Sequence, residues 1–128
     1  MNPEELRYHK EHTWVSLSGK KATIGITDYA QDQLGDIVYI DMPEIDSEVE
    51  ANVEMSEIES TKATSSVIAP LSGSIVSVNE ELEDTPEIIN EDPYGKGWIA
   101  VIEISDESEL EELMDVSDYE KYIEEEAG

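Results

Sequence analysis

The sequence predicts a mainly β fold, in which two similar hairpins face each other as a sandwich and helices follow at the C-terminal end. Three observations support this fold class. Short runs rich in β-branched and aromatic residues occupy the first third of the chain. A weak repeat matches residues 35–40 (GDIVYI) to residues 73–78 (GSIVSV), each a glycine followed by a strand with the same apolar spacing. From Ser105 onward the apolar spacing becomes helical.

The first hairpin is predicted by two short apolar runs. Residues 12–19 (HTWVSLSG) and 20–27 (KKATIGIT) both combine β-branched or aromatic residues with polar ones. Ser18 and Gly19 separate the runs, and this dipeptide is typical of a tight turn. We therefore expect two antiparallel strands joined at this step.

A short helix and a further strand are predicted next. Residues 26–35 (ITDYAQDQLG) have a helical pattern, with Thr27 or Asp28 as the N-cap and Gly35 as the stop. Residues 36–43 (DIVYIDMP) return to a strand pattern that a proline closes.

Two helical segments are predicted at the C-terminal end. Residues 105–113 (SDESELEEL) place Ser105 at the N-cap and acidic residues in the first turn, where the helix dipole favours them. Residues 117–126 (SDYEKYIEEE) begin with a capping box formed by Ser117 and Glu120. Three residues at helical spacing form an apolar stripe that can lie on the sheet: Tyr119, Tyr122 and Ile123.

The charge balance excludes several classes of partner. The 128 residues include 33 Asp and Glu against 7 Lys and Arg, a formal net charge of -26. Nucleic acids and anionic membranes attract basic proteins, and no apolar stretch approaches the roughly 20 residues that span a bilayer. The first ten residues resemble no export or transit signal, so we expect a cytoplasmic protein. The self-repulsion of so many acids suggests a halophilic protein from a salty cytoplasm, against the simpler alternative of an ordinary acidic protein.

The sequence offers little for catalysis or metal binding. There is no cysteine, which excludes disulfides, cysteine nucleophiles and thiolate metal sites. The serines lack a G-x-S-x-G context. His9 and His12 are three residues apart in a strand-like segment, where they point to opposite faces. We expect no metal site and no catalytic residues.

Lys62 is the residue that calls for an explanation. It is the lone lysine of the segment EIESTKATSSV, residues 57–67, among small hydroxylated and methyl-bearing neighbours. This segment lies between the two copies of the repeat, where a sandwich exposes a connecting turn. Most lysines are surface residues kept for solubility or ion pairing. An exposed turn with small neighbours also suits a site of enzymatic modification, and the spacing alone leaves both readings open.

Five co-linear blocks of the sequence settle this question by resemblance. They closely resemble the H protein of the glycine cleavage system, and the resemblance as a whole runs from about Tyr8 to the C-terminal helix. The blocks are GITDYAQDQLGDIVYIDMPE, ESTKATS, APLSGSIVSVN, LEDTPEIIN and DPYGKGWI. The resemblance implies a β-sandwich of the lipoyl/biotinyl type, a barrel-sandwich hybrid with short helices and with C-terminal helices packed on the sheet. It implies a single lipoyl-carrier domain over residues 1–128, with its core at about 8–104 and a C-terminal helical segment at about 106–126.

The resemblance also implies a cofactor and a set of partners. The implied cofactor is a lipoyl group joined to Lys62 by an amide. Lipoate is favoured over biotin because Thr61 and Ala63 flank the lysine, where biotinyl carriers usually have methionines. The arm takes an aminomethyl group from glycine on glycine decarboxylase, a pyridoxal-phosphate enzyme. An aminomethyltransferase passes the carbon to tetrahydrofolate, and dihydrolipoyl dehydrogenase reoxidises the dithiol. The enzymes that attach lipoate are further partners. The resemblance implies that the protein itself is a non-catalytic carrier, and we expect it to be a monomer.

In the family, the loaded arm folds into a sheltering cleft. Family members commonly carry an acid where this chain has Thr13 and another where it has Ser66. We therefore expect His12, Thr13 and Ser66 to form a site that holds the loaded arm through hydroxyl groups. This site would bind the arm more weakly than the carboxylates of the family do.

Two alternatives remain. One is an H-like protein that relays lipoyl groups to other lipoyl-dependent complexes. The other is an unmodified acidic protein that buffers calcium or binds partners.

Overall fold

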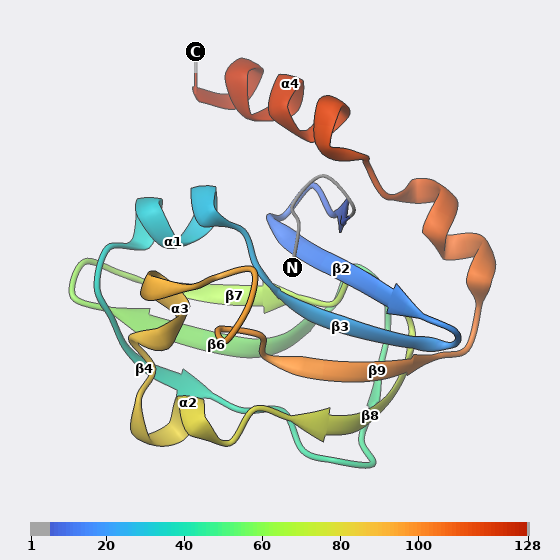
Figure 1. The fold of residues 1–128 in the computed structure, drawn as a ribbon, viewed down its shortest axis with the longest axis horizontal. Helices are drawn as coiled ribbons and strands as arrows, with labels where there is room; N and C mark the ends of the chain where they lie inside the picture. Colours follow the sequence, from blue (N-terminus) through green and yellow to red (C-terminus); the bar gives the residue numbers. More distant parts are fainter. Residues whose placement is uncertain (1–5, 128) are drawn as a thin grey trace.

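The computed structural model describes residues 6–127 (Figure 1). These residues form nine short strands with three short helices between them, followed by a 3₁₀ helix and a longer helix at the C-terminal end. The elements follow in the order β1 (Arg7–Tyr8), β2 (Thr13–Ser18), β3 (Lys21–Ile26), α1 (Asp28–Leu34), β4 (Ile37–Asp41), β5 (Glu48–Val49), β6 (Glu54–Ser60), β7 (Thr64–Ile68), β8 (Gly73–Val78), α2 (Glu81–Asp84), α3 (Ile88–Glu91), β9 (Ala100–Ile104), the 3₁₀ helix η2 (Glu107–Glu112) and α4 (Val116–Ala127).

Two antiparallel sheets form the body of the molecule, which confirms the predicted sandwich. The larger sheet has the order β1-β2-β3-β9-β8-β5, and the smaller sheet has the order β4-β6-β7. Buried aliphatic side chains from both sheets fill the space between them. They include Ile24, Ile75 and Ile102 from the larger sheet and Ile37, Ile58 and Val67 from the smaller sheet. Burial of this apolar surface is the main force that holds the two layers together.

The predicted first hairpin and the helix after it are both present. β2 and β3 pair from Thr13 opposite Ile26 to Ser18 opposite Lys21. Gly19 in the turn has a φ of 64°, a conformation that glycine adopts without steric cost. The N-cap of α1 is Thr27, whose hydroxyl oxygen accepts a hydrogen bond from the N–H of Ala30 at 3.2 Å. Of the two predicted caps, the threonine is therefore the one used.

The two copies of the sequence repeat lie in different sheets. β4 belongs to the smaller sheet and β8 to the larger sheet, so the repeated pattern supplies one strand to each layer. β4 carries a register shift between Ile37 and Tyr39. Such a bulge changes the side-chain alternation, which allows both Ile37 and Ile40 to face the core. Val38 and Tyr39 stay about half exposed on the outer surface.

The start of the first C-terminal helical segment was predicted wrongly. Its helix is the 3₁₀ helix η2, and its N-cap is Asp106 instead of Ser105. The Asp106 carboxylate accepts a hydrogen bond from the N–H of Ser108 at 3.0 Å. A carboxylate two residues before this N–H reaches it readily, so the aspartate displaces the neighbouring serine as the cap.

The capping box predicted for the last helix was also wrong. α4 begins at Val116, so Ser117 lies inside the helix. The Asp115 carboxylate accepts a hydrogen bond from the N–H of Asp118 at 2.9 Å, which is the contact expected of an N-cap residue. Of the predicted stripe, Tyr119 is buried, whereas Tyr122 and Ile123 pack partly buried against the same cluster.

A second apolar cluster holds α4 against the outer face of the larger sheet. Its buried members are Leu6, Tyr8, Trp14 and Tyr119. The rings of Tyr8 and Tyr119 stack with centroids 4.5 Å apart. The backbones of Tyr8 and Met114 exchange two hydrogen bonds of 2.8 Å, which fasten the segment before α4 to β1. Figure 1 shows α4 on the β2 side of the larger sheet.

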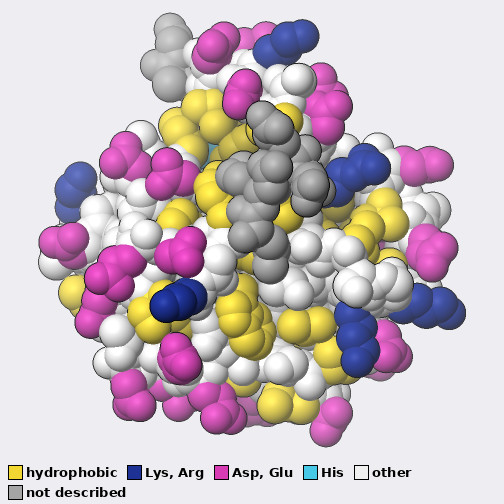
Figure 2. Space-filling view, viewed as in Figure 1, with side chains coloured by type: hydrophobic (Ala, Val, Ile, Leu, Met, Phe, Trp, Pro, Cys, Tyr) yellow, Lys and Arg dark blue, Asp and Glu magenta, His cyan; other side chains and the backbone are white. Residues whose placement is uncertain are grey.

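The surface reflects the acidic composition. In Figure 2, Asp and Glu side chains are spread around the edge of the visible face, and Lys and Arg side chains are fewer. Within residues 6–127, no helix combines the length and the apolar character that crossing a bilayer requires.

Candidate functional site

Lys62 lies at the tip of the β6–β7 hairpin, and its side chain is exposed. The hydroxyl oxygen of Ser60 accepts hydrogen bonds from the N–H groups of Lys62 at 3.2 Å and Ala63 at 3.1 Å. The same hydroxyl donates to the carbonyl oxygen of Ala63 at 3.0 Å. One serine side chain thus fixes the conformation of the turn, so the lysine is presented from a defined backbone.

One hydrogen bond holds this turn against the link between α1 and β4, and Asn90 in turn fixes that link. The N–H of Thr61 donates to the carbonyl oxygen of Asp36 at 3.0 Å. Asn90 of α3 accepts from the N–H of Ile37 at 2.9 Å and donates to the carbonyl oxygen of Gly35 at 2.9 Å. The stem of Lys62 lies beside Gly35, where a Cβ atom would be 3.1 Å from the lysine Cε. The glycine that ends α1 therefore also leaves room for the lysine side chain.

A cleft of about 300 Å³ lies next to this turn. Its walls come from α1, from the facing strands β6 and β7, from the start of β2 and from the end of α4. The lining residues are Glu11, His12, Thr13, Ile26, Tyr29, Ala30, Gln33, Leu34, Ile58, Ser65, Ser66, Val67 and Glu126. The structure therefore brings His12, Thr13 and Ser66 together in one cleft, although Ser66 is more than fifty residues from the other two.

Thr13 and Ser66 offer neutral hydroxyl groups to the cleft. Thr13 is buried, and its hydroxyl donates to the carbonyl oxygen of Ile68 at 2.9 Å. With its proton engaged, this hydroxyl offers the cleft an acceptor oxygen. Ser66 is exposed on β7. Neither residue carries a charge.

His12 has protein partners at both ring nitrogens. Nδ1 lies 2.8 Å from the hydroxyl of Tyr119, and Nε2 lies 2.9 Å from Oε2 of Glu126. The backbone at His12 has a φ of 68°, which is uncommon for a residue other than glycine. Both side-chain contacts reach α4, so His12 joins the start of β2 to the helix that closes one end of the cleft.

The hydroxyl of Tyr119 anchors α4 at this point. It lies 2.6 Å from Oγ1 of Thr27, the N-cap of α1, in addition to its contact with His12. Burial raises the pKa of Tyr119 well above its ordinary value of 10.0, and this effect exceeds the lowering by the hydrogen bond with Thr27. Burial likewise raises the pKa of Tyr8, which stacks on Tyr119. Both phenols therefore remain neutral in the folded protein.

These raised pKa values predict how stability falls in alkali. Unfolded tyrosines lose their protons near pH 10, whereas the folded chain retains the protons of Tyr8 and Tyr119 to higher pH. The stabilisation is fully present below pH 10 and is lost as the pH rises above that value. Urea unfolding at successive pH values will show this decline, and Tyr119→Phe will make it shallower. Tyr39→Phe, which alters a half-exposed ring, is the control. An equal slope in wild type and Tyr119→Phe contradicts the prediction.

Glu11 and Glu126 are cleft residues that sequence reasoning missed. Glu11 directly precedes His12 in the sequence, and this proximity to a predicted cleft residue could have identified it. Glu126 lies in the last turn of α4, more than a hundred residues away, within a run of acids. No local pattern distinguishes it from its neighbours Glu124 and Glu125, because only the packing of α4 brings one of the three to the cleft.

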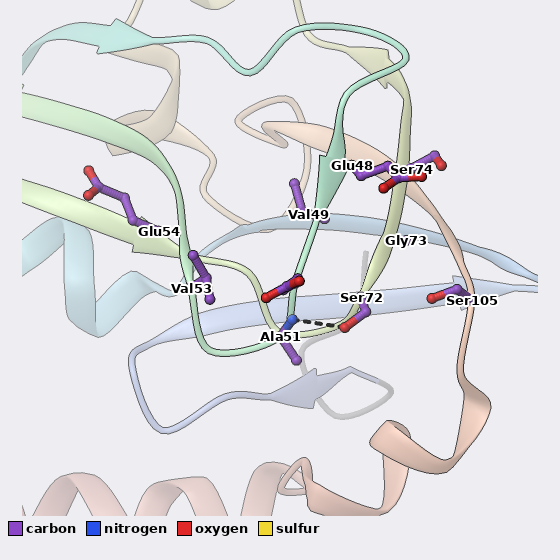
Figure 3. Close-up of a pocket in the computed structure, with 10 residues that line it drawn as sticks. Glu48, Val49, Ala51, Val53, Glu54, Ser72, Gly73, Ser74 and Ser105 are labelled. Atoms are coloured by element: carbon purple, nitrogen blue, oxygen red, sulfur yellow. Dashed lines mark hydrogen bonds between the residues drawn. The ribbon is translucent and has the colours of Figure 1, made fainter.

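A larger, open hollow of about 760 Å³ lies beside β5 and β8 (Figure 3). Its lining includes Glu48, Glu50 and Glu54, and a hydrogen bond of 3.0 Å from the N–H of Ala51 to Oγ of Ser72 joins two other residues of the lining. Glu54 begins β6 and Lys62 follows its end, so about 20 Å of strand separates this hollow from the lysine. None of the predicted site residues lines it.

A β-sandwich that presents one lysine on a fixed hairpin, beside a cleft, defines a carrier domain of the lipoyl type. Comparison with known proteins identifies the family. The family model described as "Glycine cleavage H-protein" matches residues 6–126. The chain therefore belongs to the glycine cleavage H-protein family, the carrier component of that system.

Individual relatives agree with this assignment over nearly the whole chain. The chain is 52% identical to the glycine cleavage system H protein of Halalkalibacterium halodurans over 124 residues, covering 97% of each protein. It is 50% identical to that of Carboxydothermus hydrogenoformans, covering 97% of this chain and 95% of the relative. The crystal structure of the H protein from Mycobacterium marinum is similar, with a TM-score of 0.83 at 33% identity over 94% of this chain and 97% of the other.

Proposed function

We propose that Lys62 carries lipoate through an amide bond and that the chain shuttles the aminomethyl group of glycine between the enzymes of the glycine cleavage system. The observation that carries this proposal is the exposed Lys62 on a turn fixed by Ser60. When attached, the dithiolane supplies the sulfur chemistry that a chain without cysteine lacks. The protein itself contributes binding, orientation and shelter.

The shape of the site fits such an arm. A lysine stem with a lipoyl chain extends on the order of 14 Å by bond-length arithmetic. The cleft runs along α1 from Leu34, which adjoins Gly35 and the Lys62 stem, to Tyr29. Six residues of helix rise about 9 Å, so the arm is long enough to extend from Lys62 to the far end of this cleft. His12, Thr13 and Ser66 are proposed to line the path of the arm.

The same geometry supports a carrier that serves several enzymes. The proposed partners are glycine decarboxylase, aminomethyltransferase, dihydrolipoyl dehydrogenase and the enzymes that attach lipoate. A flexible tether on a rigid turn lets the docked carrier present its end to each active site at high effective concentration. A monomer leaves the hairpin accessible to each partner in turn. The carrier is proposed to be non-catalytic, because its role is to hold and deliver the group that the enzymes transform.

Reconstitution with purified partners tests this function. The lipoylated carrier with glycine decarboxylase is expected to support exchange of labelled bicarbonate into the carboxyl group of glycine. A carrier that is lipoylated but supports no exchange contradicts the proposal and favours the relay of lipoyl groups. Absence of lipoylation by a competent ligase contradicts both readings.

The proposed setting is a cytoplasm with a high salt concentration. Among residues 6–127, no Lys or Arg nitrogen lies within 4.0 Å of a carboxylate oxygen, and the single contact of this kind made by a histidine joins His12 to Glu126. Neighbouring basic side chains therefore do not neutralise the acidic excess. Repulsion among the carboxylates destabilises the folded chain unless salt screens it. Raising KCl from about 0.05 M to about 1 M, where the Debye length falls to roughly 3 Å, will increase the melting temperature. A melting temperature that stays constant over this range contradicts the proposed setting.

A further inference from the structure

The end of the cleft away from Lys62 is its charged end. Glu11, His12 and Glu126 line the cleft together with Tyr29, which lies in the first turn of α1. The rings of His12 and Tyr29 have centroids 4.9 Å apart, so this group of residues lies beside the start of α1. Lys62 lies beside Gly35, at the other end of the same helix. About 9 Å of helix therefore separates the end of α1 beside the lysine stem from the end beside Tyr29 and His12.

The rest of the cleft wall is apolar or neutral. Ile26, Ala30, Leu34, Ile58 and Val67 supply aliphatic surface. The serines and Thr13 supply hydroxyl groups, and the proton of the Thr13 hydroxyl is already donated to the carbonyl oxygen of Ile68. A tethered chain of methylene groups can pack against such an apolar wall. A cation at its tip meets a formal negative charge only at the end formed by Glu11 and Glu126.

We propose that Glu126, assisted by Glu11, is the counter-charge for the ammonium of the aminomethyl cargo when the loaded arm lies in the cleft. The inference rests on the proposed function and adds the residues that recognise the cargo. A hydrogen bond between an ammonium and a carboxylate is about twice as strong as one between neutral groups. The hydroxyls of Thr13 and Ser66 thus supply acceptors, whereas the glutamates supply the charge.

Glu126 can take this role because its present contact is easily exchanged. Its side chain is 43% exposed, and its partner in the structure is Nε2 of His12 at 2.9 Å. Contacts between partly exposed charges add little stability, since water and salt screen them. His12 keeps its contact with the hydroxyl of Tyr119 through Nδ1 when Glu126 turns to the cargo. Recognition of the cargo therefore leaves the anchor of α4 in place.

The position of Glu126 also links the cargo to the end of α4. The last turn of α4 is acidic and contains no basic residue, and the negative end of the helix dipole disfavours this arrangement. A cation held by Glu126 offsets part of this repulsion. We therefore expect the last turn of α4 to become more ordered when the carrier is loaded.

The test measures how fast the isolated, loaded carrier loses its cargo. Water converts the thioether and its ammonium, R–S–CH₂–NH₃⁺, to the thiol R–SH, formaldehyde and NH₄⁺, so released ammonia and formaldehyde report the loss. The lipoylated carrier is loaded from glycine by glycine decarboxylase and then purified away from the enzyme. Glu126→Gln and Glu11→Gln, singly and combined, are compared with Glu124→Gln and Glu125→Gln, which alter exposed acids of the same helix.

The expected result is a loss about fivefold faster in the double variant, an intermediate rate in Glu126→Gln, and wild-type rates in the two controls. Molar KCl is expected to speed the loss in wild type and to have little effect in the double variant, because the salt screens the contact that this variant lacks. Hydrogen exchange of the α4 amides is expected to slow on loading in wild type and in the two controls, and to change little in the double variant. The melting temperature of each variant checks that it is folded.

Equal rates of loss in wild type and in a folded double variant overturn the inference. Equal acceleration by Glu125→Gln also overturns it, since the effect then reflects the overall charge of the helix. Both results leave the proposed function standing if the carrier loads normally. Failure to load in wild type, by contrast, contradicts the proposed function itself.

Discussion

Replacement of Lys62 by arginine is expected to abolish carrier activity and leave the fold intact. Arginine keeps the positive charge and much of the length of the side chain. Its guanidinium stays protonated and provides no free amine for an amide bond. Exchange of labelled bicarbonate into glycine will therefore fall to the level measured without carrier. Intact mass will lack the increment that lipoylation adds to the wild-type chain.

Lys96→Arg is the matched control for this substitution. Lys96 is also exposed, but it lies between α3 and β9 and does not line the cleft. The control is expected to keep wild-type mass increment and wild-type exchange. Because Lys62 is exposed and its turn is fixed by Ser60, Lys62→Arg will change the melting temperature little. A modified or active Lys62→Arg protein contradicts the assignment of the attachment site.

Replacement of Gly73 by alanine is expected to produce the largest loss of stability among single methyl additions to the sheets. A Cβ at this position would lie 2.1 Å from the carbonyl oxygen of Glu103 and 2.7 Å from Cγ2 of Ile102. Gly73 starts β8, which pairs with both β5 and β9, so the strand cannot shift without disturbing two ladders. Overpacking of this kind costs about 3 kcal/mol. The melting temperature will fall by about 10 °C or more.

Gly19→Ala provides the comparison for Gly73→Ala. No atom lies within 4 Å of a Cβ built on Gly19, but its φ of 64° disfavours a side chain. The cost there is about 1 kcal/mol from backbone strain alone. Urea unfolding of both variants will separate the two effects. A loss in Gly73→Ala no greater than that in Gly19→Ala contradicts the packing described for β8 and β9.

Local signals in the sequence predicted the elements that local chemistry determines. The turn at Gly19 needs a positive φ, and the start of α1 needs a side-chain acceptor, which Thr27 provides. The caps of the C-terminal helices were harder to predict because several acids and serines compete there. Asp106 and Asp115 proved to be the caps, and the sequence contains equally plausible neighbours at each place.

The cleft illustrates the same limit at the level of tertiary structure. The resemblance to a known family predicted His12, Thr13 and Ser66, and the structure gathers all three in one cleft. The resemblance did not predict that Glu126 lines the cleft. The side chain of this residue reaches the cleft because Tyr8 and Tyr119 stack and Tyr119 bonds to both His12 and Thr27. Such long-range packing leaves no periodic trace near Glu126 itself.

Peptide mass spectrometry across residues 57–67, on protein purified from its native host during growth on glycine, tests the central claim most directly. The account predicts that Lys62 carries the mass of an amide-linked lipoyl group. Unmodified Lys62 in cells that are degrading glycine would contradict it.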